Sequence, residues 1–214
     1  MTKATRPTVR GHLEGQALVL FALALTCLCG MAALAVDASG AWRAHSRLVS
    51  ACELAKDSHL NSLNAVKFSD DPAQASLDIV LDELESDGFQ GTWELTYYEL
   101  PESETGSADR FAGVRVELGQ DYRTILAGVL GHQTIQVADA LSWSVNPYSS
   151  STVWRPSGVE CRRYSGTCSA SGGASVTASE DIPESAYGSL PQDLRDAISS
   201  ARDQADHFYE DPVS

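Results

Sequence analysis

The sequence predicts an α+β protein: a long N-terminal transmembrane helix continues into an outer helical stalk, and a small antiparallel β-sheet module with short helices follows. Three observations predict this arrangement. Residues 16–36 contain no charged side chain, residues 38–67 contain no proline, and apolar side chains then alternate with polar ones in three later segments. An uncharged run of this length is typical of a membrane span, and a period of two residues is typical of a strand with one buried face.

The uncharged run is long enough to cross a bilayer. At a helical rise of about 1.5 Å per residue, residues 16–36 reach roughly 30 Å, which is the thickness of a hydrocarbon core. A buried helix of a soluble protein would show a polar face, whereas Gln16 and Thr26 are the clearly polar side chains here. We therefore predict a transmembrane helix over 15–36, preceded by a cytoplasmic segment over 1–14.

Basic residues on either side of the run predict its orientation. Lys3, Arg6 and Arg10 precede it, and Arg43 and Arg47 follow it. Because cytoplasmic flanks carry the excess of Lys and Arg, this distribution favours an N-terminus inside and a C-terminal module outside.

A cleaved secretion signal is the alternative. Ala33-Leu34-Ala35 has the small-x-small form that signal peptidases recognise, and a basic segment precedes the apolar run. The run is longer than the usual apolar region of about 7 to 15 residues, which favours retention as an anchor. A secreted or anchored extracellular binding module, cut near Ala35, stays open as the second function.

Helical periodicity continues beyond the run. Apolar residues recur near helical spacing through residue 63, and glycine occurs only at Gly40 between 38 and 67. This predicts that the transmembrane helix continues as an extracytoplasmic stalk over 37–68.

The N-terminal segment resembles the TadE/TadG-like proteins of bacterial tight-adherence (Flp) pilus systems. "EGQALVLFALAL" and "AVDASGAWRAHSRLVSACELA" share with them a Gly-Gln-Ala start, an apolar span, an aspartate at its outer end and an aromatic residue five positions later. An Arg-Leu pair and an Ala-rich acidic helix follow. The matching residues are Gly15, Gln16, Ala17, Asp37, Trp42, Arg47, Leu48, Ala51, Glu53 and Ala55.

The resemblance implies a non-catalytic minor pilin-like or assembly component in the bacterial cytoplasmic membrane, with a pilin-like fold. It also implies lipid and other pilin-like or pilus-assembly membrane proteins as partners. In such pilins a prepilin peptidase site has a glutamate at the fifth position after the glycine. That position is Leu20 when counted from Gly15 and Gln16 when counted from Gly11. The resemblance is therefore closer to the uncut TadG-like proteins. The residues expected to contact lipid or neighbouring helices are Gly15, Gln16, Leu18, Phe21, Leu25, Asp37, Trp42, Arg47 and Leu48.

Asp37 has two interpretations from the sequence. A carboxylate at the outer end of an apolar span marks its depth in the bilayer, or it meets a cationic group on a neighbouring helix. The depth marker is the favoured interpretation.

A helix and three strands are predicted for 69–160. Asp71 and Pro72 suit a helix start and Gly88 a helix end. Alternating patterns over 93–98, 112–118 and 135–145 predict three antiparallel strands, and the apolar segment 125–130 predicts a short helical turn lying on the sheet.

The C-terminal part is predicted to be loop and helix. Ser/Gly-rich sequence over 161–188 predicts a flexible loop, in which Cys161 and Cys168 form a disulfide if the segment is exported. Apolar residues at helical spacing predict a C-terminal helix within 189–214, which either docks on the module or binds a partner.

Composition and motifs argue against several functions. A formal charge of -14 repels phosphate backbones, so we expect no nucleic-acid partner. The five histidines are scattered, and no metal-site spacing, nucleophile elbow or phosphate loop is present, so we expect no enzyme activity, metal or cofactor. A membrane-tethered hydrolase that uses His132 is the remaining third possibility.

Overall fold

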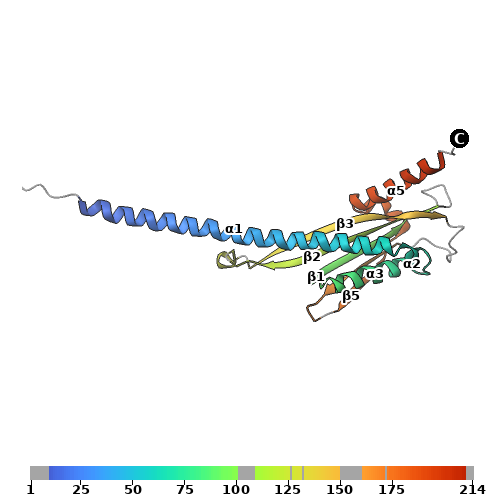
Figure 1. Cartoon of the computed structure of the whole chain (residues 1–214), viewed down its shortest axis with the longest axis horizontal. Helices are drawn as coiled ribbons and strands as arrows, with labels where there is room; N and C mark the ends of the chain where they lie inside the picture. Colours follow the sequence, from blue (N-terminus) through green and yellow to red (C-terminus); the bar gives the residue numbers. More distant parts are fainter. Residues whose placement is uncertain are drawn as a thin grey trace, which may run out of the picture. The chain divides into compact units, whose positions relative to one another are not determined.

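The structure is a computed structural model that describes residues 10–100, 109–125, 127–131, 133–149, 161–171 and 173–210. The chain forms two compact units, one of residues up to Arg43 with Tyr122–Ile135, the other of Ala44–Asp121 with the residues from Gln136 onward. Its elements confirm the predicted α+β class (Figure 1). They are α1 (Arg10–Asn61), α2 (Leu63–Lys67), α3 (Pro72–Ser86), β1 (Gly91–Glu99), β2 (Asp109–Arg123), η1 (Ala127–Leu130), β3 (Thr134–Ser149), β4 (Cys161–Cys168), β5 (Ala174–Asp181), η2 (Glu184–Ser189) and α5 (Gln192–Glu210).

Helix α1 is a single helix of 52 residues, so the predicted continuity between the apolar run and the following segment is confirmed. The last part of α1 is in addition a core element of the second unit. One stripe of α1 is buried there at spacings of three and four residues, formed by Leu48, Ala51, Cys52, Ala55 and His59.

Helix α3 begins and ends where the sequence predicts. The Asp71 side chain accepts a hydrogen bond from the Gln74 amide at 2.8 Å, and Pro72 occupies the first helical turn. At the other end Gly88 has φ +71°, the Phe89 amide donates to the Leu84 carbonyl, and the Gly88 amide donates to the Glu85 carbonyl. This is a Schellman motif, which requires a residue in the left-handed region and therefore favours glycine.

The sheet has five strands in the order β3-β2-β1-β4-β5, and not the three that the sequence predicts. β4 and β5 lie within 161–181, where the sequence predicts a flexible loop, so that prediction is wrong. β4 pairs antiparallel with both β1 and β5, so its backbone groups are satisfied on both sides without a strongly apolar sequence. Gly166 on β4 faces the Trp93 ring on β1, and a side chain at this position would collide with the indole.

The predicted disulfide between Cys161 and Cys168 is also wrong. Both are free thiols, and they are the first and last residues of β4. An extended strand rises about 3.3 Å per residue, which separates their Cα atoms by roughly 20 Å, whereas a disulfide requires less than about 7 Å.

Helices cover both faces of the sheet in the second unit. Ser142 donates to Asp193 of α5 at 2.6 Å, while the next residue, Trp143, donates to His59 of α1 at 3.1 Å. Because successive strand residues point to opposite faces, α5 lies on one face and the end of α1 on the other. Figure 1 shows α5 and α3 on opposite sides of the strands.

Helix α5 docks on the sheet, which answers one question that the sequence left open. Its apolar side is buried in a cluster formed by Tyr98, Leu100, Phe111, Cys161, Leu190, Leu194, Ile198 and Ala201. The ring of Tyr187 lies 6.0 Å from that of Tyr98 at the edge of this cluster. Gly113 of β2 leaves room for the Leu194 and Ile198 side chains, since a methyl group there would meet both.

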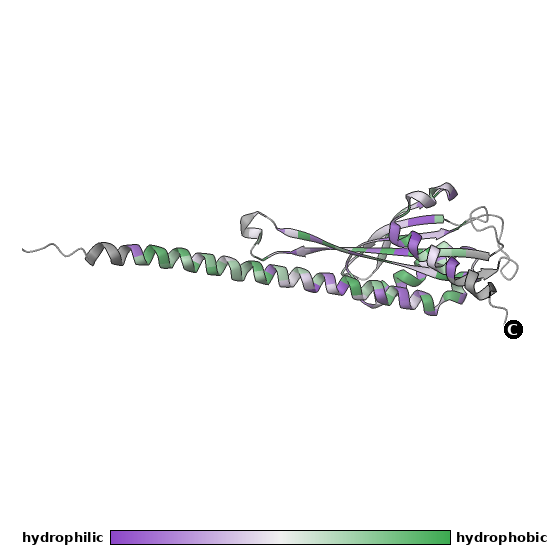
Figure 2. Cartoon of the chain, turned by 90° about the horizontal axis from the view of Figure 1, so that it is seen from above, coloured by the Kyte–Doolittle hydropathy of each residue, from purple (hydrophilic) through white to green (hydrophobic). Residues whose placement is uncertain are grey.

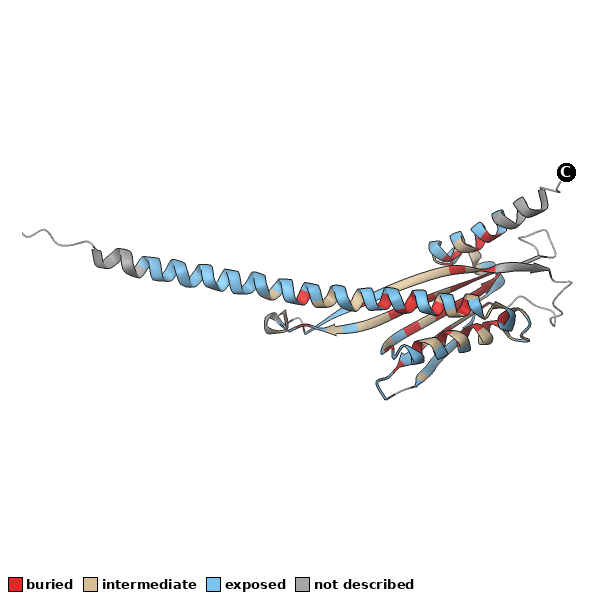
Figure 3. Cartoon of the chain, viewed as in Figure 1, coloured by how far each residue is buried: buried red, intermediate tan, exposed pale blue. Residues whose placement is uncertain are grey.

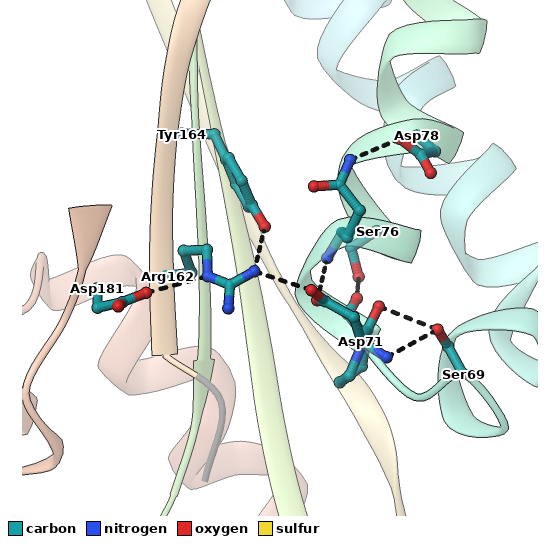
Figure 4. Close-up of polar contacts among 9 residues, drawn as sticks. Ser69, Asp71, Ser76, Asp78, Arg162, Tyr164 and Asp181 are labelled. Atoms are coloured by element: carbon teal, nitrogen blue, oxygen red, sulfur yellow. Dashed lines mark hydrogen bonds and ion pairs between the residues drawn. The ribbon is translucent and has the colours of Figure 1, made fainter. Parts of the chain in front are cut away.

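An ion-pair network joins the start of α3 to β4 and β5 (Figure 4). The Arg162 guanidinium donates to Asp71 at 2.9 Å, to Asp181 at 3.1 Å and to the Tyr164 hydroxyl at 3.0 Å. These bonds raise the pKa of Arg162, the Tyr164 hydroxyl contributing most. The same Asp71 carboxylate thus caps α3 with one oxygen and anchors β4 with the other.

A buried histidine connects three elements in the second unit. His59 Nδ1 accepts from Trp143 Nε1 of β3 at 3.1 Å, and its Nε2 lies 3.0 Å from the Ser76 hydroxyl of α3. The Ser76 hydroxyl donates to the Pro72 carbonyl, so His59 Nε2 carries the proton that Ser76 accepts. Burial lowers the pKa of His59 to about 4. A second proton would face the indole N–H, donor against donor.

We predict that this histidine makes the fold sensitive to acid. The pKa of His59 is about 4 in the folded chain and 6.5 in the unfolded chain. The contribution of neutral His59 to the free energy of unfolding is therefore complete above pH 6.5 and is lost as the pH falls towards 4. The loss at pH 4.5 is roughly 2 kcal/mol. Urea unfolding of the full chain in detergent micelles, at pH 7 and at pH 4.5, measures it.

His59→Gln is the matched variant, because glutamine can donate to Ser76 and accept from Trp143 but does not titrate. It should reduce the difference in unfolding free energy between the two pH values, whereas His45→Gln, at a side chain 43% exposed, should not. If the difference in unfolding free energy between pH 7 and pH 4.5 is unchanged in His59→Gln, His59 is not the source of the acid sensitivity.

Candidate functional site

The candidate functional site is the N-terminal part of α1 together with the tip of the β2–β3 hairpin, both in the first unit. Within the described part of the chain, one helix is long and apolar enough to cross a membrane, and its apolar window is not buried at all. Figure 2 shows the hydrophobic colour concentrated along this part of α1, and Figure 3 shows it exposed. The core helix of a soluble protein would instead be mostly buried.

Apolar side chains are exposed on every side of this segment. Leu18 is 71% exposed, Phe21 70% and Leu25 51%, and Leu20 and Leu23 on the opposite side are 64% and 59% exposed. The Thr26 hydroxyl is satisfied within the helix, because it donates to the Ala22 carbonyl at 2.8 Å. A helix with satisfied backbone and hydroxyl groups and an apolar surface all round is compatible with a hydrocarbon environment.

Asp37 is not exposed at the end of this segment but almost completely buried, with 3% of its surface accessible. Its Oδ1 accepts a hydrogen bond from the Ile125 amide at 2.8 Å, and its Oδ2 accepts from the Ala127 amide at 2.7 Å. Both carboxylate oxygens therefore bind backbone donors of the hairpin tip. The partner of Asp37 seen here is a loop of the same chain, which neither interpretation from the sequence anticipated.

A close contact one helical turn further along α1 involves the end of β2, just before the tip. The Tyr122 hydroxyl occupies the space where a side chain at Gly40 would project. Any larger residue at position 40 would displace the tyrosine, so glycine permits the approach of β2 to α1 at this point. The sequence shows a lone glycine after the span and a tyrosine before an apolar loop. Nothing in the sequence indicates that these two residues meet.

The tip itself is closed by backbone hydrogen bonds. The Thr124 amide donates to the Gln133 carbonyl at 3.0 Å, and the Gly131 amide donates to the Gly128 carbonyl at 3.2 Å. The predicted short helical turn is present as η1. It belongs to the unit that contains the start of α1, where Asp37 binds the amides of Ile125 and Ala127.

The remaining predicted contact residues separate into two groups. Gln16 and Trp42 are exposed, Trp42 at 72%, and Arg47 is exposed as well, while Gly15 lies within α1 before the apolar segment. Leu48 is only 1% exposed and packs in the core of the second unit. Leu48 therefore stabilises the fold of this chain and is not available to a neighbouring helix.

Two observations concern reactive side chains elsewhere in the described residues. Among the described residues, no group of three or more His, Cys, Asp or Glu side chains is arranged to hold a metal ion. Burial raises the pKa of the Cys52 thiol to about 12, with a further contribution from Asp139, so this thiol stays protonated. His132, the residue considered for a hydrolase, lies outside the described residues.

Comparison with known proteins identifies the same helix. Residues 15–55 match the family model Tad, described as Flp pilus-assembly TadE/G-like. No curated protein and no solved structure matches the chain significantly. The matched region contains the exposed apolar segment, Asp37 and the first buried turns of α1 in the second unit. Residues 15–55 of this chain are therefore similar to the TadE/G-like family of Flp pilus-assembly proteins.

Proposed function

We propose that this chain is a membrane-anchored minor pilin-like or assembly component of a tight-adherence (Flp) pilus system, and that it acts without catalysis or a cofactor. The observation that carries the proposal is that two features occur together in helix α1. The TadE/G-like match covers the apolar segment that is exposed on all sides and also the turns that enter a folded module. In this proposal the first part of α1 is the anchor, and its last turns belong to the displayed module.

Lateral helix packing is the proposed mode of action. Exposed leucine and phenylalanine side chains contact lipid tails as readily as they contact another apolar helix, so lipid contacts can be exchanged for contacts with similar helices during assembly. Leu18, Phe21 and Leu25 are three and four residues apart and lie on one helical face. The partners on this face are other pilin-like or pilus-assembly membrane proteins.

The proposed orientation places the N-terminus in the cytoplasm and the second unit outside the bacterial cytoplasmic membrane. Lys3, Arg6 and Arg10 precede the apolar segment, and the strongly acidic remainder of the chain is poorly suited to the anionic cytoplasmic face of a bilayer. The outer unit is then the displayed part of the molecule.

Retention of the apolar segment is the first prediction of this proposal. The native protein should enter the detergent-rich phase in a cloud-point separation, because an uncharged helical run of about 20 mostly apolar residues favours hydrocarbon. Mass spectrometry of that protein should find an N-terminus at Met1 or Thr2. Recovery of intact chain in the aqueous phase would contradict anchoring, and Val36 as the first residue would support the secreted binding module instead.

The packing face is the second prediction. Leu18→Ala combined with Phe21→Ala should leave the chain in the membrane but reduce its recovery with pilus-assembly membrane proteins after detergent solubilisation, by roughly tenfold if about 1.4 kcal/mol of packing is lost. Leu20→Ala combined with Leu23→Ala is the matched control, since these exposed leucines lie on the opposite face. Equal losses for the two pairs would contradict a specific face.

A further inference from the structure

An exposed apolar side chain projects from the hairpin tip of the first unit. Ile125 is 67% exposed, although the sequence from Thr124 to Gly131 contains no charged residue and only one hydroxyl. Apolar residues at the tip of a hairpin are not needed to close the turn, because backbone hydrogen bonds of the tip already do so. Packing within the described chain therefore leaves the Ile125 side chain largely uncovered.

The position of the tip along α1 is fixed by hydrogen bonds. Asp37 is the first residue after the uncharged segment that ends at Val36, and its carboxylate binds the amides of Ile125 and Ala127 at 2.8 and 2.7 Å. Ile125 is consequently held beside the end of the apolar segment, at the level where α1 leaves hydrocarbon if it spans a bilayer.

Two features of the tip suit an interfacial environment. Irregular backbone near hydrocarbon is tolerated when its donors are satisfied, and Asp37 satisfies two amides that would otherwise require water. Aromatic side chains that favour the headgroup layer lie nearby in the first unit: Tyr122 is packed against Gly40, and Trp42, 72% exposed, is two residues further along α1.

We propose that the β2–β3 tip is a second membrane contact, in which Ile125 enters the interfacial layer of the leaflet that α1 leaves. The proposal rests on the proposed anchoring of α1. A lipid surface is the occupant, because the Ile125 amide is bound to the residue that directly follows the apolar span and the Ile125 side chain is exposed there. Asp37 is a positioning residue, which holds the loop at this depth.

Photo-cross-linking of the full-length chain tests this contact. A benzophenone amino acid is placed at Ile125, at Leu23 in the apolar segment, or at Thr177 on the exposed strand β5, and each protein is reconstituted in phosphatidylcholine–phosphatidylglycerol vesicles. Lipid adducts should form at Leu23 and at Ile125, and their yield at Thr177 should be at least about fivefold lower than at Ile125.

The outcomes distinguish the contact from the anchor. Adducts at Leu23 without adducts at Ile125 would overturn the tip contact and leave the anchor intact, and so would cross-links from Ile125 to protein in place of lipid. Absence of adducts at Leu23 would overturn both. Because Ile125 is exposed, replacing it should not disturb folding.

The role of Asp37 is tested in the same vesicles. Asp37→Ala removes both acceptors and should lower the lipid adduct yield at Ile125 severalfold, while the yield at Leu23 stays the same. Asp37→Asn retains one acceptor and a similar shape and should give an intermediate yield. Unchanged yields at Ile125 in both variants would overturn the positioning role.

Discussion

The bond between the Asp37 carboxylate and the amides of Ile125 and Ala127 is the constraint on which the first unit depends. A buried carboxylate is costly unless hydrogen bonds satisfy it, and an irregular loop beside an apolar helix is costly unless its amides are satisfied. The hydrogen bonds between the carboxylate and the two amides remove the desolvation cost of both. The apolar segment therefore ends at a polar residue that is bound within the chain.

Helix α1 meets two different environments without a break. Its apolar segment exposes large side chains on all sides, whereas one stripe from Leu48 to His59 is buried in the second unit. The second pattern is the ordinary one for a helix on a sheet, and the first is suited to lipid or to other apolar helices. Helix α1 therefore contributes residues to both units.

The second unit is held by polar contacts as well as by its apolar clusters. His59 joins α1 to β3 and α3, and Arg162 joins the start of α3 to β4 and β5. Buried or half-buried networks of this kind specify which elements meet, because a misplaced partner leaves a donor or acceptor unsatisfied. This specificity matters for a sheet whose edge strand β5 has little apolar surface of its own.

The sequence by itself determined the features that depend on local pattern: the uncharged segment, the continuous α1, the Asp71 cap, the Gly88 stop and the strand periodicity of β1, β2 and β3. Only the tertiary structure decided the partner of Asp37, the burial of Leu48 and the strands between Cys161 and Asp181. Those strands exist because neighbours satisfy their backbone, and Asp37 binds amides about 90 residues away. Contacts between distant residues leave no periodic signal in a single sequence.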